Sequence, residues 1–303
     1  MPISETWNYM RQRTLTDEQR AEAKRRSQQK WYEKNKTTEQ RKARERRNGD
    51  PNLAPMYVSS CSFGKDSLAT VLLALEHNEP LDRVAFCEVM YDHKRQISGE
   101  LPRHIEWINE VARPKLQSWG LQVDTIRADS DFLTLFNQHI YSGHRKGMVR
   151  GFPYSGGCYV ESYLKTAAIR RYYRELKNLR PIICYVGIAA DEKSRLVGIN
   201  HSKTKISLLD KYGVTEAQAK EMCRANGLLS PIYEDTIRTG CWFCPNRKIK
   251  DFAMFAKEHP CLWQELVDLG KVENRAGNNF TYTETIEDID TIVQGMNKQL
   301  TLF

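Results

Sequence analysis

The sequence predicts an α/β fold in which a mostly parallel sheet is flanked by helices. Past a breaker at residues 48–51, short apolar segments alternate with longer segments of helical pattern. The candidate strands are residues 56–60, 83–90, 121–126 and 182–188. The candidate helices begin at Ser67, near Glu100, at Tyr159 and at Thr215. Such alternation is typical of parallel sheets, because each crossover between parallel strands needs a connection of helical length.

Positive charge is concentrated near the N-terminus. The first 50 residues contain 14 Lys and Arg against 8 Asp and Glu, whereas the remaining 253 contain 32 against 30. Thr16 and Gln19 have capping-box spacing, which predicts a helix through this basic segment. A nucleic-acid phosphate backbone is the natural partner of such an arm; a solvated helix without a partner is the alternative. We expect four parts: a basic helical arm (1–50), a nucleotide-binding domain (51–205), a small cysteine-rich helical subdomain (206–275) and a tail (276–303).

The sequence indicates a cytoplasmic protein without a membrane partner. No apolar run approaches the length of a bilayer span, and the first residues lack the apolar block of a signal peptide. In that compartment the eight cysteines are expected to be thiols or metal ligands rather than a disulfide framework.

A phosphate-binding turn is predicted between the first strand and the first helix. It consists of Ser62, Phe63, Gly64, Lys65, Asp66 and Ser67. At a strand-to-helix turn, backbone amides and the helix dipole favour an anion, and Lys65 adds a positive charge. The turn is not a Walker A loop, because Lys65 is followed by Asp66 instead of Ser or Thr. An ordinary strand-to-helix turn is the alternative.

This turn resembles the phosphate loop of the PP-loop ATP pyrophosphatases. The resemblance implies an adenine nucleotide alpha hydrolase-like fold and an enzyme that cleaves ATP between its α- and β-phosphates. It also places Asp66 near a nucleotide-bound Mg²⁺ and gives Lys65 and Asp66 catalytic roles. Asp92, just beyond the second candidate strand, matches a family position for an acidic residue near the nucleotide; a turn residue is the alternative.

A second segment resembles the phosphoadenosine phosphosulfate (PAPS) reductase-like branch of that superfamily. Residues 186–195 follow the fourth candidate strand and resemble the element Gly-Ile-x-Ala-x-Glu-x-x-Arg. The resemblance implies that Gly187, Asp191 and Glu192 lie at the nucleotide, and that Arg195 is a catalytic residue that binds an anionic group. A surface cluster of ion pairs is the alternative reading of Asp191, Glu192 and Arg195.

Cys241 and Cys244 form a C-x-x-C turn whose thiolates can bind one metal. The run from 213 to 245 resembles a PAPS-reductase-like subgroup with Gly-Cys-Trp-Phe-Cys-Pro. That resemblance implies Cys223 and Cys158 as the other ligands, with Cys261 in reserve. Four thiolates fit either zinc or a 4Fe-4S cluster, and the family favours the cluster.

The resemblance implies an enzyme nearest in character to the DNA-phosphorothioation sulfur-transfer enzymes. Such an enzyme would adenylate an acceptor, release pyrophosphate and support sulfur transfer or other modification of nucleic acid, with a sulfur donor protein as partner. Two alternatives are a sulfonucleotide (PAPS or APS) reductase that uses an external thiol and a non-catalytic, DNA-associated nucleotide-binding regulator. No cysteine follows Cys261, which disfavours a reductase with a nucleophilic tail thiol.

The C-terminal peptide resembles the Gln-Leu-x-Leu-Phe motif by which bacterial DNA-processing proteins bind the sliding clamp. The matching residues are Gln299, Leu300, Leu302 and Phe303. Together with the basic arm, this motif favours DNA over RNA. A tail that folds back onto its own domain is the alternative.

Overall fold

The computed structural model describes residues 17–48, 50, 52–153, 157–176, 180–235 and 238–300. The chain forms two compact units. One comprises Met1–Ala54 with Leu179–Pro181, and the other comprises Pro55–Asn178 with Ile182–Phe303.

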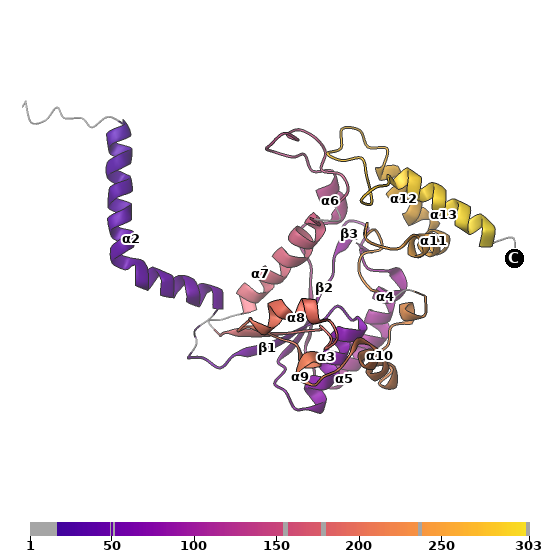
Figure 1. The fold of residues 1–303 in the computed structure, drawn as a ribbon, viewed down its shortest axis with the longest axis horizontal. Coiled ribbons are helices and arrows are strands. Elements are labelled where there is room, and N and C mark those ends of the chain that lie inside the picture. The colour runs from indigo at the N-terminus through magenta and orange to yellow at the C-terminus, as the bar shows by residue number, and fades with distance from the viewer. Residues whose placement is uncertain are drawn as a thin grey trace, which may run out of the picture. The chain divides into compact units, whose positions relative to one another are not determined.

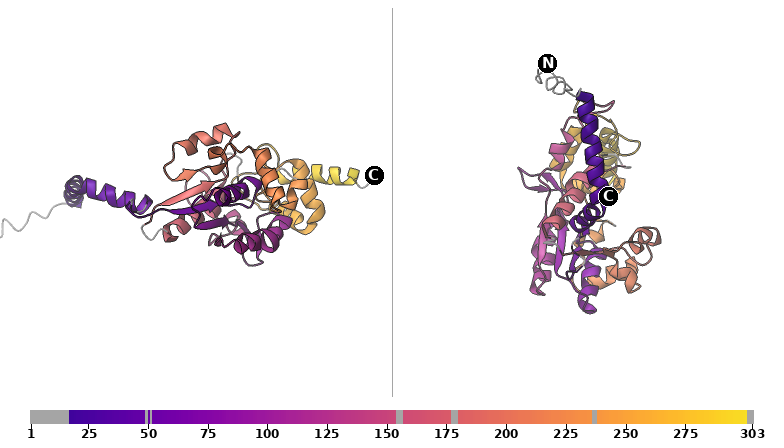
Figure 2. Two further views of the ribbon diagram at one scale, coloured as in Figure 1. Left: turned by 90° about the horizontal axis from the view of Figure 1, so that it is seen from below. Right: turned by 90° about the vertical axis from the view of Figure 1, so that its left-hand side faces the viewer.

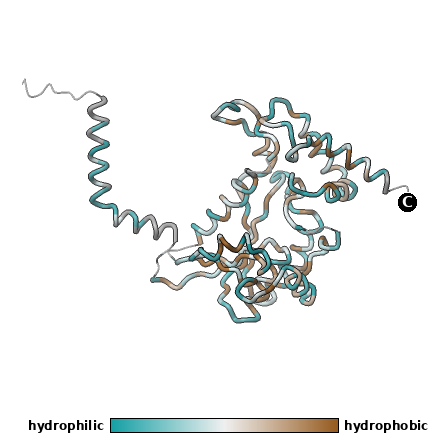
Figure 3. The backbone as a smooth tube through the Cα atoms, in the orientation of Figure 1, coloured by the Kyte–Doolittle hydropathy of each residue, from teal (hydrophilic) through white to brown (hydrophobic). Residues whose placement is uncertain are grey.

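The first unit contains the helix expected in the basic arm. Helix α2 (Asp17–Asn48) is 32 residues long and hydrophilic along its described length (Figure 3). Trp31 is 57% exposed, and Glu22 accepts a hydrogen bond from Arg26 at 2.6 Å, one turn further on. Thr16, the predicted N-cap, lies outside the described residues. A solvent-exposed helix of this composition has no apolar face with which to build a core.

A five-stranded parallel sheet is the centre of the second unit (Figure 1). Its strands, in sheet order, are β5 (Val123–Ile126), β2 (Arg83–Cys87), β1 (Met56–Ser60), β6 (Ile182–Val186) and β7 (Lys205–Ile206). The predicted α/β fold is therefore confirmed. The two-residue strand β7 is absent from the sequence-based prediction, because so short a segment carries no periodicity.

Helices cover both faces of the sheet (Figures 1 and 2). The helices of this unit are α3 (Lys65–Glu76), α4 (Pro102–Trp107), α5 (Arg113–Ser118), α6 (Phe132–Phe136), α7 (Ala167–Leu176), α8 (Lys193–Asn200), α9 (Leu208–Lys211), α10 (Glu216–Ala225), α11 (Ile249–Glu258), α12 (Pro260–Leu269) and α13 (Ile286–Leu300). The π-helical turns η1 (Ile108–Ala112) and η2 (Val160–Thr166) precede α5 and α7, and η3 (Pro231–Glu234) is a 3-10 turn. Among the described residues, no helix combines the length and apolar character that crossing a bilayer requires.

Side-chain alternation along the strands divides the core into two layers. Val84 and Phe86 pack with α3 on one face, while Ala85 and Cys87 pack with α7 on the other. Helix α10 lies against α3 and begins at the expected capping box, in which Thr215 and Gln218 bond each other's backbone amides. The amphipathic pattern and the cap agree on where this helix starts.

A third, aromatic core lies around the cysteine turn. Trp242 stacks on Phe255 of α11 with ring centres 4.7 Å apart, and it contacts Tyr91 at 4.6 Å. Tyr91 belongs to β3 (Met90–Asp92), which pairs in antiparallel fashion with β4 (Ile97–Ser98). This core therefore takes side chains from both sides of position 205, where the sequence suggested a domain boundary.

The clamp-binding motif is mostly outside the described structure. Helix α13 extends to Leu300, but the side chains of Gln299 and Leu300 and all of residues 301–303 are not described. Clamp binding stays a prediction.

Gly187→Ala is expected to destabilise the second unit, because a Cβ at this position would lie 2.6 Å from the Ser67 amide nitrogen and 2.7 Å from the Asp66 carbonyl carbon. Backbone must move to relieve such contacts, at a cost of roughly 1–3 kcal/mol. Urea unfolding of the purified variant measures this change.

The matched control is Gly198→Ala in α8, where a new Cβ meets nothing within 4 Å. That change is expected to stabilise the protein by roughly 0.5–1 kcal/mol through helix propensity. Equal effects of the two substitutions would contradict the close approach at Gly187.

Candidate functional site

The loops that follow β1 and β6 lie side by side at the carboxyl ends of the strands. Strands β2 and β5 lie on one side of β1 in the sheet, and β6 and β7, which come later in the chain, lie on the other side. In open α/β sheets, the crevice at such a reversal of strand order is where ligands bind. Both segments singled out from the sequence, residues 62–67 and 186–195, begin at this point.

The turn after β1 has an unusual backbone conformation. Phe63 has φ of +56° although its side chain is fully buried, with its ring edge against Phe86 at 5.3 Å between ring centres. A bulky residue rarely adopts this left-handed conformation. Gly64 follows as the N-cap of α3, and a Cβ there would lie 3.0 Å from the Tyr233 hydroxyl. The surrounding packing thus holds the turn in a shape that the chain does not favour by itself, as is frequent at binding sites.

The N-terminus of α3 presents donors to the crevice. The first amides of an α-helix have no partner within the helix, and its dipole adds partial positive charge there. Ser67 Oγ donates to the Gly64 carbonyl at 2.9 Å and lies 3.4 Å from Ser62 Oγ. These groups form a polar cradle suited to an oxyanion.

Tyr233 closes this cradle from the far end of the sequence. Its hydroxyl accepts a hydrogen bond from the Lys65 amide at 3.0 Å. Burial raises the pKa of Tyr233 to about 12, so the phenol keeps a proton that it can donate to an anionic group.

Carboxylates surround the Lys65 ammonium. Lys65 Nζ lies 2.8 and 2.9 Å from the two Asp66 oxygens and 3.4 Å from Glu216 at the start of α10. Burial raises the pKa of Asp66, Lys65 opposes that effect, and the charges of Glu216 and Glu192 add to it. Asp66 and Glu216 both face this lysine, and a divalent cation would relieve the repulsion between their carboxylates. Carboxylate oxygens are ligands that Mg²⁺ prefers.

The loop after β6 joins this group through backbone contacts. Gly187 touches the Asp66–Ser67 peptide, as described above, and Asp191 accepts a hydrogen bond from the Glu216 amide at 3.1 Å. Glu192 caps the Ala189 amide at 3.0 Å and is paired with Arg195. Arg195 is 58% exposed, and an exposed ion pair of this kind costs little to break.

Asp92 holds the turn that follows β3. Its Oδ1 accepts from the Lys94 and Arg95 amides, and its Oδ2 accepts from the Arg95 guanidinium at 2.6 Å. These contacts, with Arg95 as the largest contribution, lower the pKa of Asp92. Arg95 in turn bonds Glu265. Among the described contacts none joins Asp92 to the phosphate loop, and its place near the nucleotide stays a prediction.

Cys223 does not lie with the other proposed metal ligands, which corrects that assignment. It is fully buried under the phosphate loop, where its thiol donates to the Lys65 carbonyl at 3.1 Å. Its spacing from the C-x-x-C turn suggested a shared centre, but α10 carries it to the core beside α3.

The other three cysteines do come near one another. Cys158 and Cys241 both pack against the aromatic core. Burial, followed by the charge of Cys244, raises the pKa of Cys158; burial, Glu100 and the two other cysteines raise the pKa of Cys241. As free thiols these groups disfavour one another's ionisation, and a bound cation would reverse that effect.

Thiol sulfurs are suitable metal ligands, but the spacing of these three does not form a metal site in this structure. In the described part of the chain, no three His, Cys, Asp or Glu side chains surround one point closely enough to hold a metal ion. Cys241 and Cys244 belong to one tight turn, closed by a hydrogen bond from the Cys244 amide to the Cys241 carbonyl at 3.1 Å. Arg247 braces the same turn, since its Nε donates to the Cys241 carbonyl at 2.8 Å. Cys261 is exposed on α12.

Sequence reasoning missed His104, which supports the phosphate loop from behind. The ring is fully buried on α4, with Nε2 3.3 Å from the Ser62 carbonyl and Nδ1 2.9 Å from Ser230 Oγ. A carbonyl can only accept, so Nε2 carries the proton and Nδ1 accepts from the serine. Burial lowers the pKa of His104 to about 4, which keeps the ring neutral. Nothing local in the sequence marks His104, Tyr233 or Glu216, because their partners lie far away along the chain.

Comparison with known proteins gave one structural similarity. No protein-family model and no curated protein matched the chain. Among solved structures, it is similar to the U34-tRNA thiolase NcsA from Methanococcus maripaludis, a structure that contains its 4Fe-4S cluster. The alignment covers 83% of this chain and 86% of that one, with 17% sequence identity and a TM-score of 0.35. A similarity at that level gives no evidence about the site, whose description rests on the geometry of this chain.

The neutral state of His104 makes stability depend on pH. The unfolded ring takes up a proton as pH falls through about 6.5, whereas the folded ring resists until about pH 4. The unfolded state therefore binds more protons in this window, and lowering the pH from 7.5 to 5 is expected to cost about 2 kcal/mol of unfolding free energy.

Urea unfolding at both pH values measures this loss. His104→Gln is expected to remove most of the dependence, whereas His201→Gln, at an exposed histidine, should retain it. An unchanged slope in His104→Gln would show that other groups cause the loss.

Proposed function

We propose that this protein is an ATP-dependent adenylating enzyme of the PP-loop type that supports sulfur transfer to, or another modification of, nucleic acid. One observation carries the proposal. At the reversal of strand order, a strained turn with Lys65 at a helix N-terminus meets the glycine-bearing loop after β6. The two motifs were singled out separately, 120 residues apart, and such a crevice is where open α/β sheets bind nucleotides.

The residues of the crevice suit the triphosphate of ATP. The amides at the start of α3, Ser62 and Ser67 would bind phosphate oxygens, and Lys65 would add a point charge. Asp66 would hold the Mg²⁺ that accompanies ATP, with Glu192 and Glu216 nearby. The ion supplies charge neutralisation on the phosphate oxygens. Arg195, which is exposed, would bind an anionic part of either substrate.

The proposed reaction has two substitutions. An acceptor oxygen attacks the α-phosphorus, a new P–O bond forms, and the bond to the bridging oxygen breaks so that pyrophosphate leaves with its electron pair. Hydrosulfide (HS⁻) from the donor then attacks the acceptor atom, a C–S or P–S bond forms, the bond to the adenylated oxygen breaks so that AMP leaves with that oxygen, and the sulfur gives up its proton to solvent. The protein contributes alignment of the acceptor and stabilisation of charge at the α-phosphate, by Lys65 and Arg195.

Cys158, Cys241 and Cys244 would hold a metal centre, for which we favour a 4Fe-4S cluster over zinc. The cluster supplies a site for holding sulfur when it is bound. The protein's own contribution is a turn braced by Arg247 and walled by the aromatic core, which limits access of water to the sulfurs. Three thiols would hold such a centre, and any fourth ligand would come from outside these three cysteines.

The acceptor is nucleic acid in this proposal, and DNA is favoured. Helix α2 supplies a basic, solvent-exposed surface suited to a phosphate backbone. The peptide at 299–303 would bind a sliding clamp, and a sulfur donor protein would complete the reaction.

Lys65→Ala is expected to weaken ATP binding roughly 10- to 100-fold, the usual effect of removing a charged donor from a phosphate. Isothermal titration with Mg-ATP measures this change. Lys203→Ala, at an exposed loop lysine, is the control and should bind ATP as the wild type does. Equal affinity in all three proteins would reject the phosphate loop as the nucleotide site.

Iron, sulfide and zinc analysis after anaerobic purification tests the cysteine centre. Serine substitutions at Cys158, Cys241 and Cys244 are each expected to remove most of the bound metal. Cys223→Ser and Cys261→Ser should keep it, because these two residues lie elsewhere. Metal loss in Cys223→Ser with normal thermal stability would restore the original four-cysteine assignment. Zinc without iron would assign the centre a structural role.

A further inference from the structure

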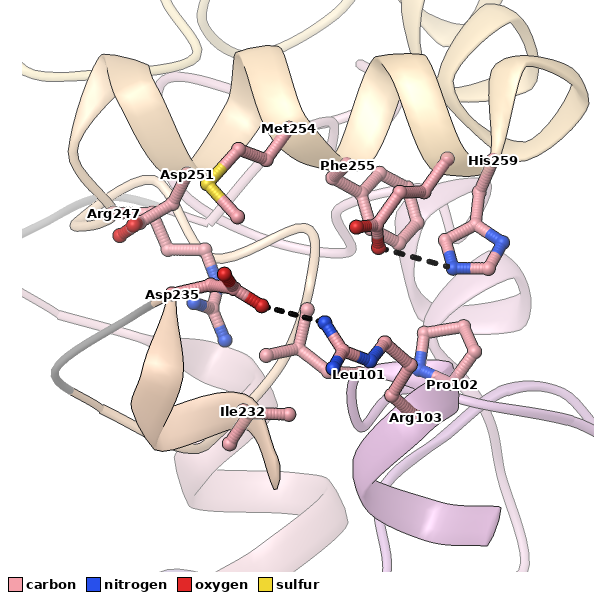
Figure 4. A pocket seen from close by; sticks show the side chains of 11 residues that line it. Leu101, Pro102, Arg103, Ile232, Asp235, Arg247, Asp251, Met254, Phe255 and His259 are labelled. Atoms are coloured by element: carbon pink, nitrogen blue, oxygen red, sulfur yellow. Dashed lines mark hydrogen bonds and ion pairs between the residues drawn. The ribbon is translucent and has the colours of Figure 1, made fainter. Parts of the chain in front are cut away.

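The pocket between the start of α4, the turn η3 and helix α11 is too small for a nucleotide (Figure 4). Its volume is about 40 Å³, which holds only a few water molecules. Arg103 and Asp235, which line it, are joined to each other by an ion pair. A nucleic-acid strand would therefore need an open surface of the second unit.

The continuous helical segment formed by η2 and α7 has a buried face and an exposed face. Helix α7 covers one face of the sheet (Figure 1), and Ala168 and Tyr172 pack in the layer between them. Tyr163, Arg170 and Arg174 are exposed. Since Arg170 and Arg174 are four residues apart, their side chains are neighbours on the helix surface, about 6 Å apart along its axis. Neighbouring phosphates on a single nucleic-acid strand have a comparable separation.

The two exposed arginines of α7 are not neutralised by the protein. Within the described part of the chain, no hydrogen bond, ion pair or ring contact engages the guanidinium of Arg170 or of Arg174. Arg171, on the same helix, differs in that it pairs with Asp129. The exposed acid of α7, Glu175, is offset from Arg174 by about 100° around the helix axis. Like charges one turn apart repel each other, and a polyanion along this face would relieve that repulsion.

Tyr163 lies where this helix meets a basic hairpin, residues 138–150. The guanidinium of Arg150, at the end of the hairpin, lies over the Tyr163 ring at 5.4 Å from its centre. Even so, the Tyr163 side chain is 54% exposed. The hairpin belongs to a stretch, residues 132–160, that contains three Lys and Arg but no Asp or Glu. An exposed aromatic ring within positive charge is the combination by which proteins bind single strands, since the ring stacks on a base while the cations attract the backbone.

The Tyr163 end of this face leads to the proposed active site. Cys158 lies about one π-helical turn before Tyr163, and its carbonyl accepts from the Ser162 amide at 3.2 Å. The thiol of Cys87, the last residue of β2, donates to the carbonyls of residues 164 and 165 at 3.8 Å. Tyr163 is therefore held near the carboxyl edge of the sheet, where the phosphate loop also lies.

We propose that this face binds one unpaired strand of the nucleic-acid substrate, with Arg170 and Arg174 at neighbouring phosphates and a base stacked on Tyr163. The proposal rests on the proposed function for the choice of a polymer. Arg150 braces the tyrosine ring, and the strand leads from α7 toward Cys158. A duplex fits less well, because its base faces are already covered by the neighbouring bases in the stack.

Fluorescence anisotropy with a labelled single strand of about 12 nucleotides tests the arginines, in the full-length protein and without ATP. The affinity is measured between about 50 and 200 mM salt. The double variant Arg170→Ala/Arg174→Ala is expected to reduce the slope of log affinity against log salt by about 1.4, since each phosphate contact on a single strand contributes about 0.7. The control Lys203→Ala/Lys205→Ala removes the same charge from exposed positions at β7 and should keep the slope.

Tyr163→Ala tests the stacked base in the same assay. It is expected to weaken single-strand binding roughly tenfold without changing the salt slope, because a ring is lost and no charge. Tyr163→Phe keeps the ring and should bind as the wild type does. The wild-type protein is expected to bind the matching duplex more weakly than the single strand. All of these substitutions lie at exposed positions, so the fold should be retained.

The outcomes separate this inference from the proposed function. An unchanged salt slope in the double arginine variant, or wild-type affinity in Tyr163→Ala, overturns the strand site even if Mg-ATP binds normally. A wild-type protein that binds no strand, or that prefers the duplex, also overturns it. DNA and RNA strands of the same sequence are compared, and losses seen with only one of them support the site and identify the polymer. Both expected losses support the strand site even if Lys65→Ala shows that ATP binds elsewhere.

Discussion

The close approach of the β6 loop to the first turn of α3 is the constraint on which the site depends. With hydrogen in place of a side chain, Gly187 lets the backbone after β6 touch the Asp66–Ser67 peptide. Because of this contact, the two loops at the reversal of strand order face a common space. The same contact sets the start of α10 beside Lys65, since Asp191 accepts from the Glu216 amide. One glycine thereby brings the loop that carries Asp191 and Glu192 next to the turn that carries Lys65 and Asp66.

That arrangement has an electrostatic consequence for nucleotide binding. Lys65 already contacts Asp66 and Glu216, so its charge is largely neutralised before any phosphate arrives. A bare anion would have to displace these carboxylates from Lys65 and then lie beside them. An anion that brings a divalent cation meets no such penalty, because the cation pairs with the carboxylates while the lysine turns to the phosphate. The proposed nucleotide site would therefore favour a metal-bound nucleotide over free phosphate.

The local features of this site could be predicted from the sequence, and its long-range contacts could not. The strand, turn and helix around Lys65, and the cap at Thr215, each depend on a few adjacent residues, so local pattern was sufficient to find them. His104, Tyr233 and Glu216 reach the phosphate loop from 42, 168 and 151 residues away along the chain, and no periodicity reports such pairs. Cys223 shows the opposite error. Its spacing from Cys241 suggested a shared metal, but the spacing of cysteines in sequence does not specify which core receives each helix.

The turn η3 joins three features that would otherwise be independent. Ser230 bonds His104 behind the phosphate loop, Tyr233 bonds the Lys65 amide in front of it, and Asp235 pairs with Arg103 on α4. Further along the chain, the Gly240 amide donates to buried Glu100, and the Gly240 carbonyl accepts from Arg247. A phosphate that draws on the Tyr233 hydroxyl would therefore act on the same short stretch that holds His104 and Arg103, so the phosphate loop and α4 are coupled through η3.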